Sequence, residues 1–274
     1  MKCKMEEVGG LKTRWLHEGD GPVFLMIHGV GGSGDMWYKN IDFLAERGYT
    51  VVAPDIVGHG FTAAANFDGE PPQMVAVKHL NALMDHIGAD QYIVGGSSYG
   101  ALISSLMYFD RPDRVTKAVL IGSGSTFHPS DDQIKTLQGA RANGSKAMQE
   151  PTWHVCNQRL GNICYDPATV LTETLLVQMT SYSLPDRLDA YLSTIEGLMA
   201  TADTHRVYDK LEKMDLPVLI ITGREDIRSN WELTVEGQKR MPDARLEIYD
   251  KCGHLPMSEY PDKFNEQVLE FLSA

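Results

Sequence analysis

The chain has 274 residues, of which 43% are hydrophobic and 23% charged, values typical of a globular protein with a substantial core. Its formal net charge of −12 argues against nucleic-acid binding and against anionic membrane surfaces. The longest apolar runs, such as 23–27, are too short to span a membrane, and residues 1–10 lack the apolar core of a secretory signal. We therefore expect a cytoplasmic protein.

Short apolar runs alternate with amphipathic stretches along most of the chain, a rhythm that predicts a mostly parallel sheet flanked by helices. An edge strand is expected at 11–17, as one half of a hairpin with an earlier strand. Core strands are expected at 23–28, 50–54, 91–95, 117–122, 217–223 and 245–249. Helices are expected at 36–47, 74–87, 99–110, 230–241 and 261–272.

The alternation stops between residues 125 and 215, where no strong strand pattern occurs. Helices are expected there at 131–142, 168–182 and 185–202. The predicted organisation is a core of residues 1–124 and 216–274, with a helical insertion at 125–215 after the strand at 117–122. The insertion carries many methionines and aromatic residues, most of which we expect to pack within the insertion while a minority line a pocket.

The most informative motif is Gly96-Ser97-Ser98-Tyr99-Gly100, which lies between an expected strand and an expected helix. In that context a G-x-S-x-G pentapeptide turns the strand sharply into the helix and exposes the hydroxyl of its central serine. The backbone N–H groups of the first helical turn would lie beside that hydroxyl. Ser98 is therefore the candidate nucleophile.

A serine hydroxyl is a weak nucleophile that needs a base, and the base needs an orienting acid. Asp226 follows the expected strand at 217–223, and His254 follows the expected strand at 245–249. Ser98, Asp226 and His254 would thus each lie past the carboxyl end of a different strand, the edge at which open parallel sheets bind ligands. The ordered set, more than any one of the three residues, is the specific signal.

At these residues the sequence resembles the α/β-hydrolase family, over about residues 10–271. The resemblance also rests on 28–32 (HGVGG), 54–60 (PDIVGHG) and 253–256 (GHLP) ahead of Glu259. It implies that Ser98 is the nucleophile, Asp226 the acid and His254 the base of a catalytic triad. It also implies an oxyanion hole made by the backbone N–H groups of Val30 and Tyr99, with Gly31 as the alternative to Val30, and a helical cap at 125–215.

No metal or organic cofactor is expected. The four cysteines have no metal-ligand spacing and are expected to be free thiols, and the remaining histidines show no zinc pattern. His28, Asp55 and His59 are expected to be structural residues of the loops around the oxyanion hole. The expected partner is a small-molecule substrate, with neither nucleic acid nor membrane, and a homodimer is left open.

Within the family, the chain resembles capped, single-domain hydrolases, which include carboxylesterases and meta-cleavage-product C–C hydrolases. Residues 251–254 (KCGH) and the position of Asn40 favour the C–C hydrolases. Ser97 and Leu255 oppose them, because these enzymes carry Asn before the nucleophile and many carry Trp after the base. An arginine that would hold the dienoate carboxylate is not clearly placed; the candidates are Arg159 and Arg187.

We therefore expect first a serine hydrolase, an esterase that cleaves a small, largely apolar carboxylic ester through an acyl-enzyme on Ser98. The alternative is hydrolysis of a C–C bond in a 2-hydroxy-6-oxo-dienoate, and a third hypothesis is a non-catalytic receptor for a small ligand. Substrate contacts are predicted for Gly31, Asn40, Ser97, Trp153, Met179, Tyr182 and Leu255.

Overall fold

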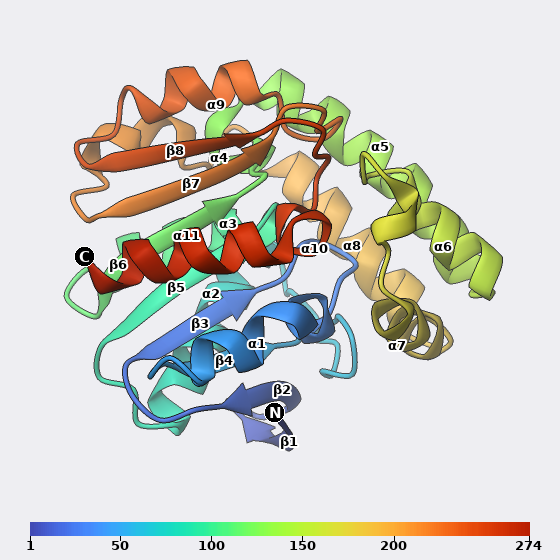
Figure 1. Cartoon of the computed structure of the whole chain (residues 1–274). Helices are drawn as coiled ribbons and strands as arrows, with labels where there is room; N and C mark the ends of the chain where they lie inside the picture. The colour runs from blue at the N-terminus through green and yellow to red at the C-terminus, as the bar shows by residue number, and fades with distance from the viewer.

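The computed structural model describes residues 1–274 and contains one eight-stranded sheet, shown in Figure 1. The strands are β1 (Lys2–Val8), β2 (Leu11–Glu18), β3 (Val23–Ile27), β4 (Thr50–Pro54), β5 (Tyr92–Ser97), β6 (Val115–Ile121), β7 (Val218–Gly223) and β8 (Ala244–Tyr249). Their order in the sheet is β1-β2-β4-β3-β5-β6-β7-β8. Strands β1 and β2 form the expected hairpin, β2 runs antiparallel to β4, and all other neighbours are parallel. The predicted fold class is confirmed.

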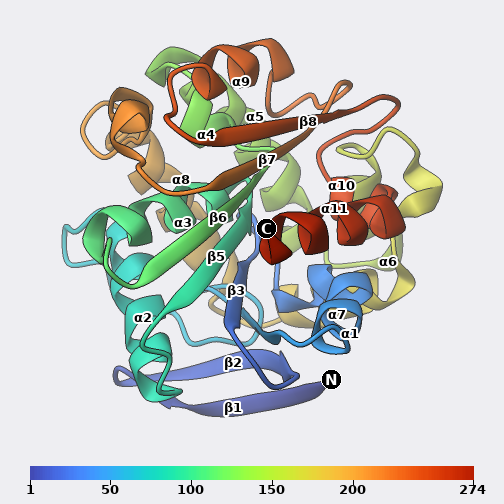
Figure 2. The same cartoon turned by 60° about the vertical axis from the view of Figure 1, so that its left-hand side comes forward.

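The inner strands are covered on both faces, which explains their continuous apolar sequences. Every residue of β4, β5 and β7 is buried. Helices α1 (Tyr38–Ala45) and α11 (Pro261–Ser273) cover one face of the sheet, and α2 (Pro72–His86) and α3 (Tyr99–Asp110) cover the other, as Figure 2 shows. The remaining short helices are η1 (Gly34–Trp37), α4 (Gly124–Phe127), η3 (Tyr208–Lys213), α9 (Trp231–Gln238) and α10 (Pro256–Glu259).

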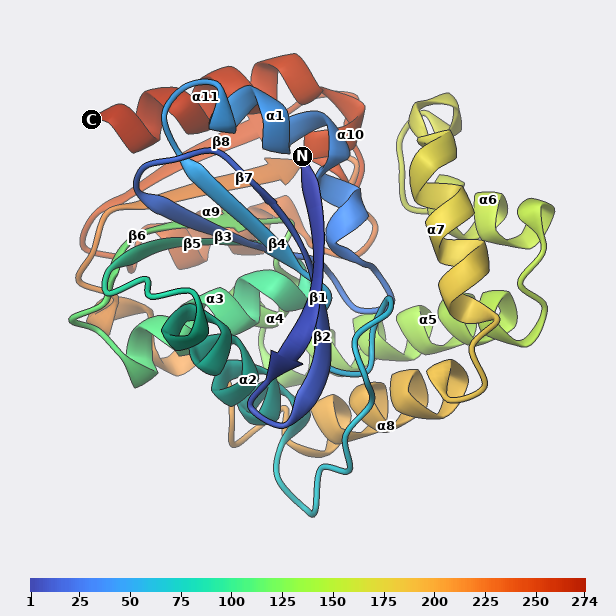
Figure 3. The ribbon, with the colours of Figure 1, turned by 90° about the horizontal axis from the view of Figure 1, so that it is seen from below.

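The segment between β6 and β7 contains helices and no strand. It comprises α4, α5 (Ser130–Gln149), α6 (Trp153–Gly161), η2 (Pro167–Thr169), α7 (Thr172–Tyr182), α8 (Arg187–Ala200) and η3. Figure 3 shows α5 beside α8 and α6 beside α7, and we call α5 to α8 the inserted helices. Their buried apolar side chains belong to the same hydrophobic cluster as those of the sheet. None of the helices in the structure has both the length and the apolar character that crossing a bilayer would need.

Several helix boundaries differ from the sequence prediction. Helix α6 was not predicted; it begins after Thr152, whose side chain accepts a hydrogen bond from the Val155 N–H. Helix α5 continues to Gln149, because Gly144 lets the ring of Tyr191 pack directly against the helix backbone. The expected helices at 36–47 and 168–182 each begin as a separate short 3₁₀ turn, η1 and η2.

Candidate active site

The turn between β5 and α3 holds Ser98 in a conformation that few non-glycine residues adopt. Its φ is 57° and its ψ is −115°, outside the allowed regions for an L-residue. The flanking glycines are required by close backbone contacts. A Cβ at Gly96 would collide with the backbone of Gly100, and a Cβ at Gly100 would collide with the carbonyl of Ile27. The motif thus places a partly exposed serine side chain at the start of α3.

Asp226 and His254 form a hydrogen-bonded pair past the ends of β7 and β8. The His254 Nδ1–H donates to Asp226 Oδ2 at 2.8 Å, and both residues are buried. Asp226 Oδ1 accepts from the backbone N–H groups of Arg228 at 2.7 Å and Ser229 at 3.1 Å, which fixes the carboxylate. With Nδ1 as the donor, Nε2 of His254 is the nitrogen left to accept a proton.

Two backbone N–H groups beside Ser98 have no protein acceptor. Neither Val30 N–H nor Tyr99 N–H donates a hydrogen bond within the protein, and both residues line the same pocket as Ser98 and His254. The N–H of Gly31 is also free, but Gly31 does not line this pocket. Free N–H donors that converge beside a nucleophile can stabilise an oxyanion.

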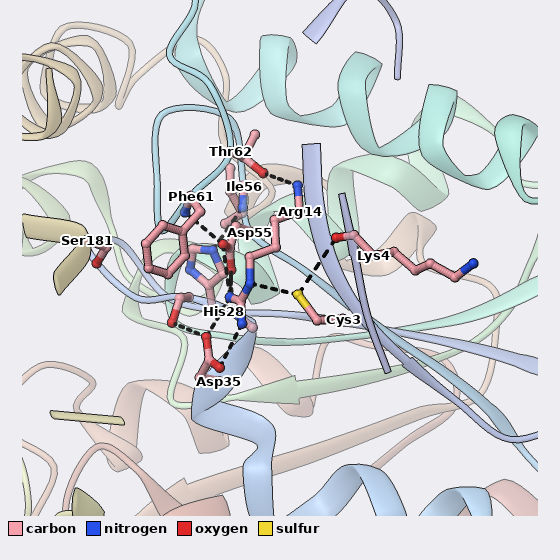
Figure 4. Close-up of polar contacts among 12 residues, drawn as sticks. Cys3, Lys4, Arg14, His28, Asp35, Asp55, Ile56, Phe61, Thr62 and Ser181 are labelled. Carbon is pink, nitrogen blue, oxygen red and sulfur yellow. Dashed lines mark hydrogen bonds and ion pairs between the residues drawn. The ribbon is translucent and has the colours of Figure 1, made fainter. Parts of the chain in front are cut away.

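Arg14, Asp35 and Asp55 form a polar network, drawn in Figure 4, beside the loop after β3 that carries Val30. Arg14 binds Asp35 through two hydrogen bonds, at 2.6 and 2.9 Å, and binds Asp55 at 3.1 Å. Asp55 also accepts from the backbone N–H of Gly34 at 2.7 Å and of Phe61 at 2.9 Å. This network links β2, the loop after β3 and the loop after β4. Asp55 holds these segments together, the structural role that the sequence predicts for it.

His28 and His59 are neutral structural groups behind this loop. His28 donates from Nδ1 to the Gly29 carbonyl at 2.7 Å and accepts at Nε2 from the Ile56 N–H at 2.9 Å. Burial lowers the pKa of His28 to about 4 and that of His59 to about 3. Neither ring reaches the pocket, so His254 is the histidine positioned to act as a base.

The pocket above Ser98 is lined by 28 residues, 12 of them hydrophobic, and it contains no Asp or Glu. Its fixed cations are Arg159, from α6, and Arg228, from the loop after β7. Arg159 is buried; its Nη2 donates to the Val30 carbonyl at 3.3 Å, and its Nε has no partner. Neither guanidinium forms an ion pair with a carboxylate of the protein.

Ser97 and Leu255 line the pocket as predicted, whereas the other five predicted substrate contacts do not. Asn40 is buried between α1 and α11, where its Nδ2 donates to Asn265 Oδ1 at 2.8 Å. Trp153 is 46% exposed at the start of α6. The Tyr182 hydroxyl donates a hydrogen bond to the Gly31 carbonyl, and both residues lie behind those that line the pocket. Met179 packs against the hydrophobic cluster.

The inserted helices contact the histidine loop through a glutamate. The His254 N–H donates to the Ile163 carbonyl at 2.7 Å, and the Tyr165 N–H donates to Glu259 Oε2 at 2.8 Å. Glu259 Oε1 accepts from the Gly253 N–H at 2.9 Å. Glu259 therefore ties the segment after α6 to the loop that positions the base.

The matching family model is that of the alpha/beta hydrolase fold, over residues 22–261. Because this match spans most of the chain, the protein belongs to the α/β-hydrolase-fold family, and it is an enzyme of the hydrolase class.

Two curated relatives of the chain are named as hydrolases of 2-hydroxy-6-oxo-dienoates and related dioates. One is the 2-hydroxy-6-oxononadienedioate/2-hydroxy-6-oxononatrienedioate hydrolase of Pseudomonas sp, 28% identical over 92% of this chain and 88% of the relative. Another is the 2-hydroxy-6-oxo-6-phenylhexa-2,4-dienoate hydrolase of Burkholderia cepacia, 27% identical over 93% of this chain and 89% of the relative. The structure of a meta-cleavage product hydrolase from Pseudomonas fluorescens has a TM-score of 0.83, with 24% identity over 98% of this chain and 97% of the other. A thermophilic esterase from Thermogutta terrifontis has a TM-score of 0.80, with 17% identity over 100% and 98%. At these identities the solved structures show the shared fold alone.

Proposed function

We propose that this hydrolase cleaves the C–C bond of a 2-hydroxy-6-oxo-dienoate by attack of Ser98 on the 6-oxo carbonyl. The sequence alone puts hydrolysis of an apolar ester first and this reaction second. The names of the curated relatives favour the second reaction, and so does the charge of the pocket.

The observation that carries the proposal is the unpaired guanidinium of Arg159 in the pocket. A small apolar ester offers nothing to a buried cation, whereas the dienoate carries a carboxylate at C1. Arg159 uses one of its five N–H groups on the Val30 carbonyl, and its Nε is buried without a partner. Arg187, the other candidate, is bound to Asp186 and to the Thr62 carbonyl and does not line the pocket.

The proposed roles follow from the geometry of the site. His254 Nε2 removes the Ser98 proton, and Asp226 holds the tautomer and stabilises the imidazolium. The N–H groups of Val30 and Tyr99 receive the oxyanion, an interaction worth roughly 3–4 kcal/mol per donor. The inserted helices act as a cap that closes the pocket from above.

Cleavage of a C–C bond requires a carbon leaving group that can carry the electron pair of that bond. In the 2-oxo tautomer of the substrate, the proton of the 2-hydroxyl has moved to C5. When Ser98 has attacked C6, the C5–C6 bond breaks and its electron pair spreads through C4 and C3 to the C2 oxygen. His254 returns its proton to the resulting dienolate, and water then hydrolyses the acyl-enzyme to the free acid. Because all four cysteines are free thiols, we assign this reaction to the cytoplasm.

The test compares two substrates on one preparation. A yellow 2-hydroxy-6-oxo-6-phenylhexa-2,4-dienoate should be bleached with a kcat/KM about 100-fold or more above that for p-nitrophenyl butyrate, because the ester leaves Arg159 unpaired. Ser98→Ala should abolish bleaching. Ester turnover without dienoate turnover would restore the esterase hypothesis, and turnover of neither would favour the receptor hypothesis.

A further inference from the structure

A tight turn at residues 29–32 carries the Val30 N–H, the proposed oxyanion donor. The Gly32 N–H donates to the Gly29 carbonyl at 2.9 Å, which closes the turn. Gly31 has a φ of 72°, the sign and size that a type II turn has at its third residue, and glycine adopts such values without steric cost. The turn therefore has a defined peptide geometry, which determines the direction of each of its N–H groups.

The inserted helices close around Gly31. A Cβ at this position would lie 2.6 Å from Arg159 Nη2, 3.1 Å from the Tyr191 ring and 3.4 Å from the Tyr182 hydroxyl. These three side chains come from α6, α8 and α7 respectively. Arg159 donates to the Val30 carbonyl at 3.3 Å, and the Tyr182 hydroxyl donates to the Gly31 carbonyl. The inserted helices thus hold the carbonyls of both central residues of the turn.

A series of hydrogen bonds leads from Tyr182 to the pocket. Its hydroxyl donates to the Gly31 carbonyl, and the same peptide group donates through the Gly32 N–H to the Gly29 carbonyl. That carbonyl shares a peptide group with the Val30 N–H, and in a trans peptide the N–H points opposite to the carbonyl. The series therefore ends at an N–H that has no protein acceptor, on a residue that lines the pocket.

Hydrogen bonds in such a series strengthen one another. Donation to a peptide carbonyl polarises the peptide group and makes its N–H a stronger donor, by roughly 10–30% per bond. Burial raises the pKa of Tyr182, so its hydroxyl stays protonated and acts as the donor. His28 also donates to the Gly29 carbonyl, at 2.7 Å from the core side. Loss of the Tyr182 hydroxyl should therefore weaken and misorient the oxyanion donor in a turn that remains folded.

We propose that Tyr182 is a positioning residue for the oxyanion hole and acts through the turn at 29–32, behind the residues that line the pocket. The inserted helices then have a second role besides covering the pocket, because the oxyanion hole is complete only while α7 lies against the turn. This inference rests on the proposed roles of Ser98 and the Val30 N–H. It does not rest on which bond is cleaved, because ester and C–C hydrolysis both form an oxyanion at the attacked carbonyl.

The kinetic test removes the hydroxyl and keeps the ring. Tyr182→Phe should lower kcat about tenfold, less than the loss of roughly 10²–10³-fold for a whole oxyanion donor, while KM changes by less than about threefold. The assay uses the 6-phenyl dienoate and p-nitrophenyl butyrate. Tyr92→Phe is the matched control, because Tyr92 is also buried, its hydroxyl donates to Asn81 Oδ1 at 3.0 Å, and it does not line the pocket. It should keep the wild-type kcat.

Binding of 2,2,2-trifluoroacetophenone probes the oxyanion hole without turnover. Ser98 adds to the ketone carbonyl, the serine proton passes to His254, and the carbonyl oxygen becomes an oxyanion. The dissociation constant, measured by ¹⁹F NMR, should rise in Tyr182→Phe by about the factor by which kcat falls, and should not change in Tyr92→Phe. Gly31→Ala places a Cβ against Arg159 Nη2 and should give the same pattern, with an effect that is less than multiplicative when combined with Tyr182→Phe.

The outcomes separate this inference from the proposed function. A lower kcat in Tyr182→Phe with an unchanged dissociation constant for the ketone would place the effect outside the oxyanion hole and overturn the inference, as would equal losses in Tyr92→Phe. If the dienoate is not cleaved but ketone binding depends on the Tyr182 hydroxyl, the proposed function is refuted and the inference stands. If the dienoate is cleaved and Tyr182→Phe has both wild-type values, the inference is refuted and the proposed function stands.

Discussion

Asp226 and Glu225 are neighbouring acids whose hydrogen bonds separate their roles. Asp226 binds the His254 ring, whereas Glu225 accepts from the Cys252 backbone N–H at 3.0 Å. Asp226→Asn should reduce kcat about 10⁴-fold, because the amide would favour the wrong imidazole tautomer. Glu225→Gln, measured in the same steady-state assay, should change kcat little. The opposite ranking would move the acid to Glu225.

Ser98 and His254 should behave as one functional unit, because proton removal by the base has no use without the nucleophile. Ser98→Ala and His254→Ala should each remove most of kcat, and the double variant should be little worse than either single variant. Single-turnover and steady-state rates of all three proteins provide the measurement. Losses that multiply would show that the two side chains act independently.

The residues that the sequence identified share one property: each lies within a local motif. Ser98, Tyr99 and Val30 lie in glycine-rich turns, and Asp226 and His254 follow strand ends, so spacing along the chain was sufficient to find them. Arg228 also follows a strand end, two residues after Asp226, and that position was the signal that was missed. Five predicted substrate contacts do not line the pocket, because those predictions depended on which way a helical or loop side chain points, as the burial of Asn40 between two helices shows.

At the scale of elements, the contact between the inserted helices and the histidine loop depends on Glu259. Glu259→Gln would place an amide N–H₂ against backbone donors and should destabilise the protein by about 1.5–3 kcal/mol. Because His254 would be held less firmly, kcat should fall about tenfold with a smaller change in KM. The exposed Glu266 on α11 gives the matched control, and Glu266→Gln should leave both values unchanged. A Glu259→Gln protein with normal kcat would make this contact purely structural.

The inserted helices should determine which substrate fits, without supplying catalytic groups. Leu171 lines the pocket, whereas Trp153 lies outside it. Leu171→Ala should change the relative kcat/KM between short and bulky 6-substituents by an amount equivalent to ~1–3 kcal/mol, and Trp153→Ala should not. Labelling of Ser98 by a small phosphonylating reagent should survive in both variants. Loss of labelling in a folded Leu171→Ala protein would contradict this division of labour.

Strands were easier to predict than the inserted helices. Strand β4 and helix α3 have the predicted boundaries, because burial on both faces leaves a continuous apolar signal. Helix α6 has only 9 residues, too few for a clear periodicity in the sequence, and it depends on the Thr152 cap and on packing against α5 and α7. Tertiary contacts, which a single sequence does not display, decide such elements.

At the scale of the whole molecule, buried neutral histidines should make the protein sensitive to acid. Burial lowers the pKa values of His28 and His79 to about 4 from 6.5. The unfolded chain therefore binds more protons between those values, and the free energy of unfolding should decrease as the pH falls from 6.5 towards 4. Thermal melting at pH 7.5, 6, 5 and 4 would measure this. His79→Gln, far from the pocket, should reduce the pH-dependent loss by up to about 3 kcal/mol. A variant with the wild-type pH profile would exclude His79 as a source of this sensitivity.

The backbone conformation of Ser98 has a consequence for how the protein balances activity against thermostability. Glycine tolerates φ 57° and ψ −115°, whereas alanine keeps the Cβ and its steric conflict. The free energy of unfolding of Ser98→Gly should therefore be about 1 kcal/mol higher than that of the wild-type protein and of Ser98→Ala. This value includes the loss caused by the larger chain entropy of glycine in the unfolded state. Equal stability of all three proteins in urea unfolding would show that the turn carries no strain. If the stabilities have this order, the most stable of the three proteins is the inactive Ser98→Gly variant. A serine at this position is then explained by selection for turnover and not by selection for stability.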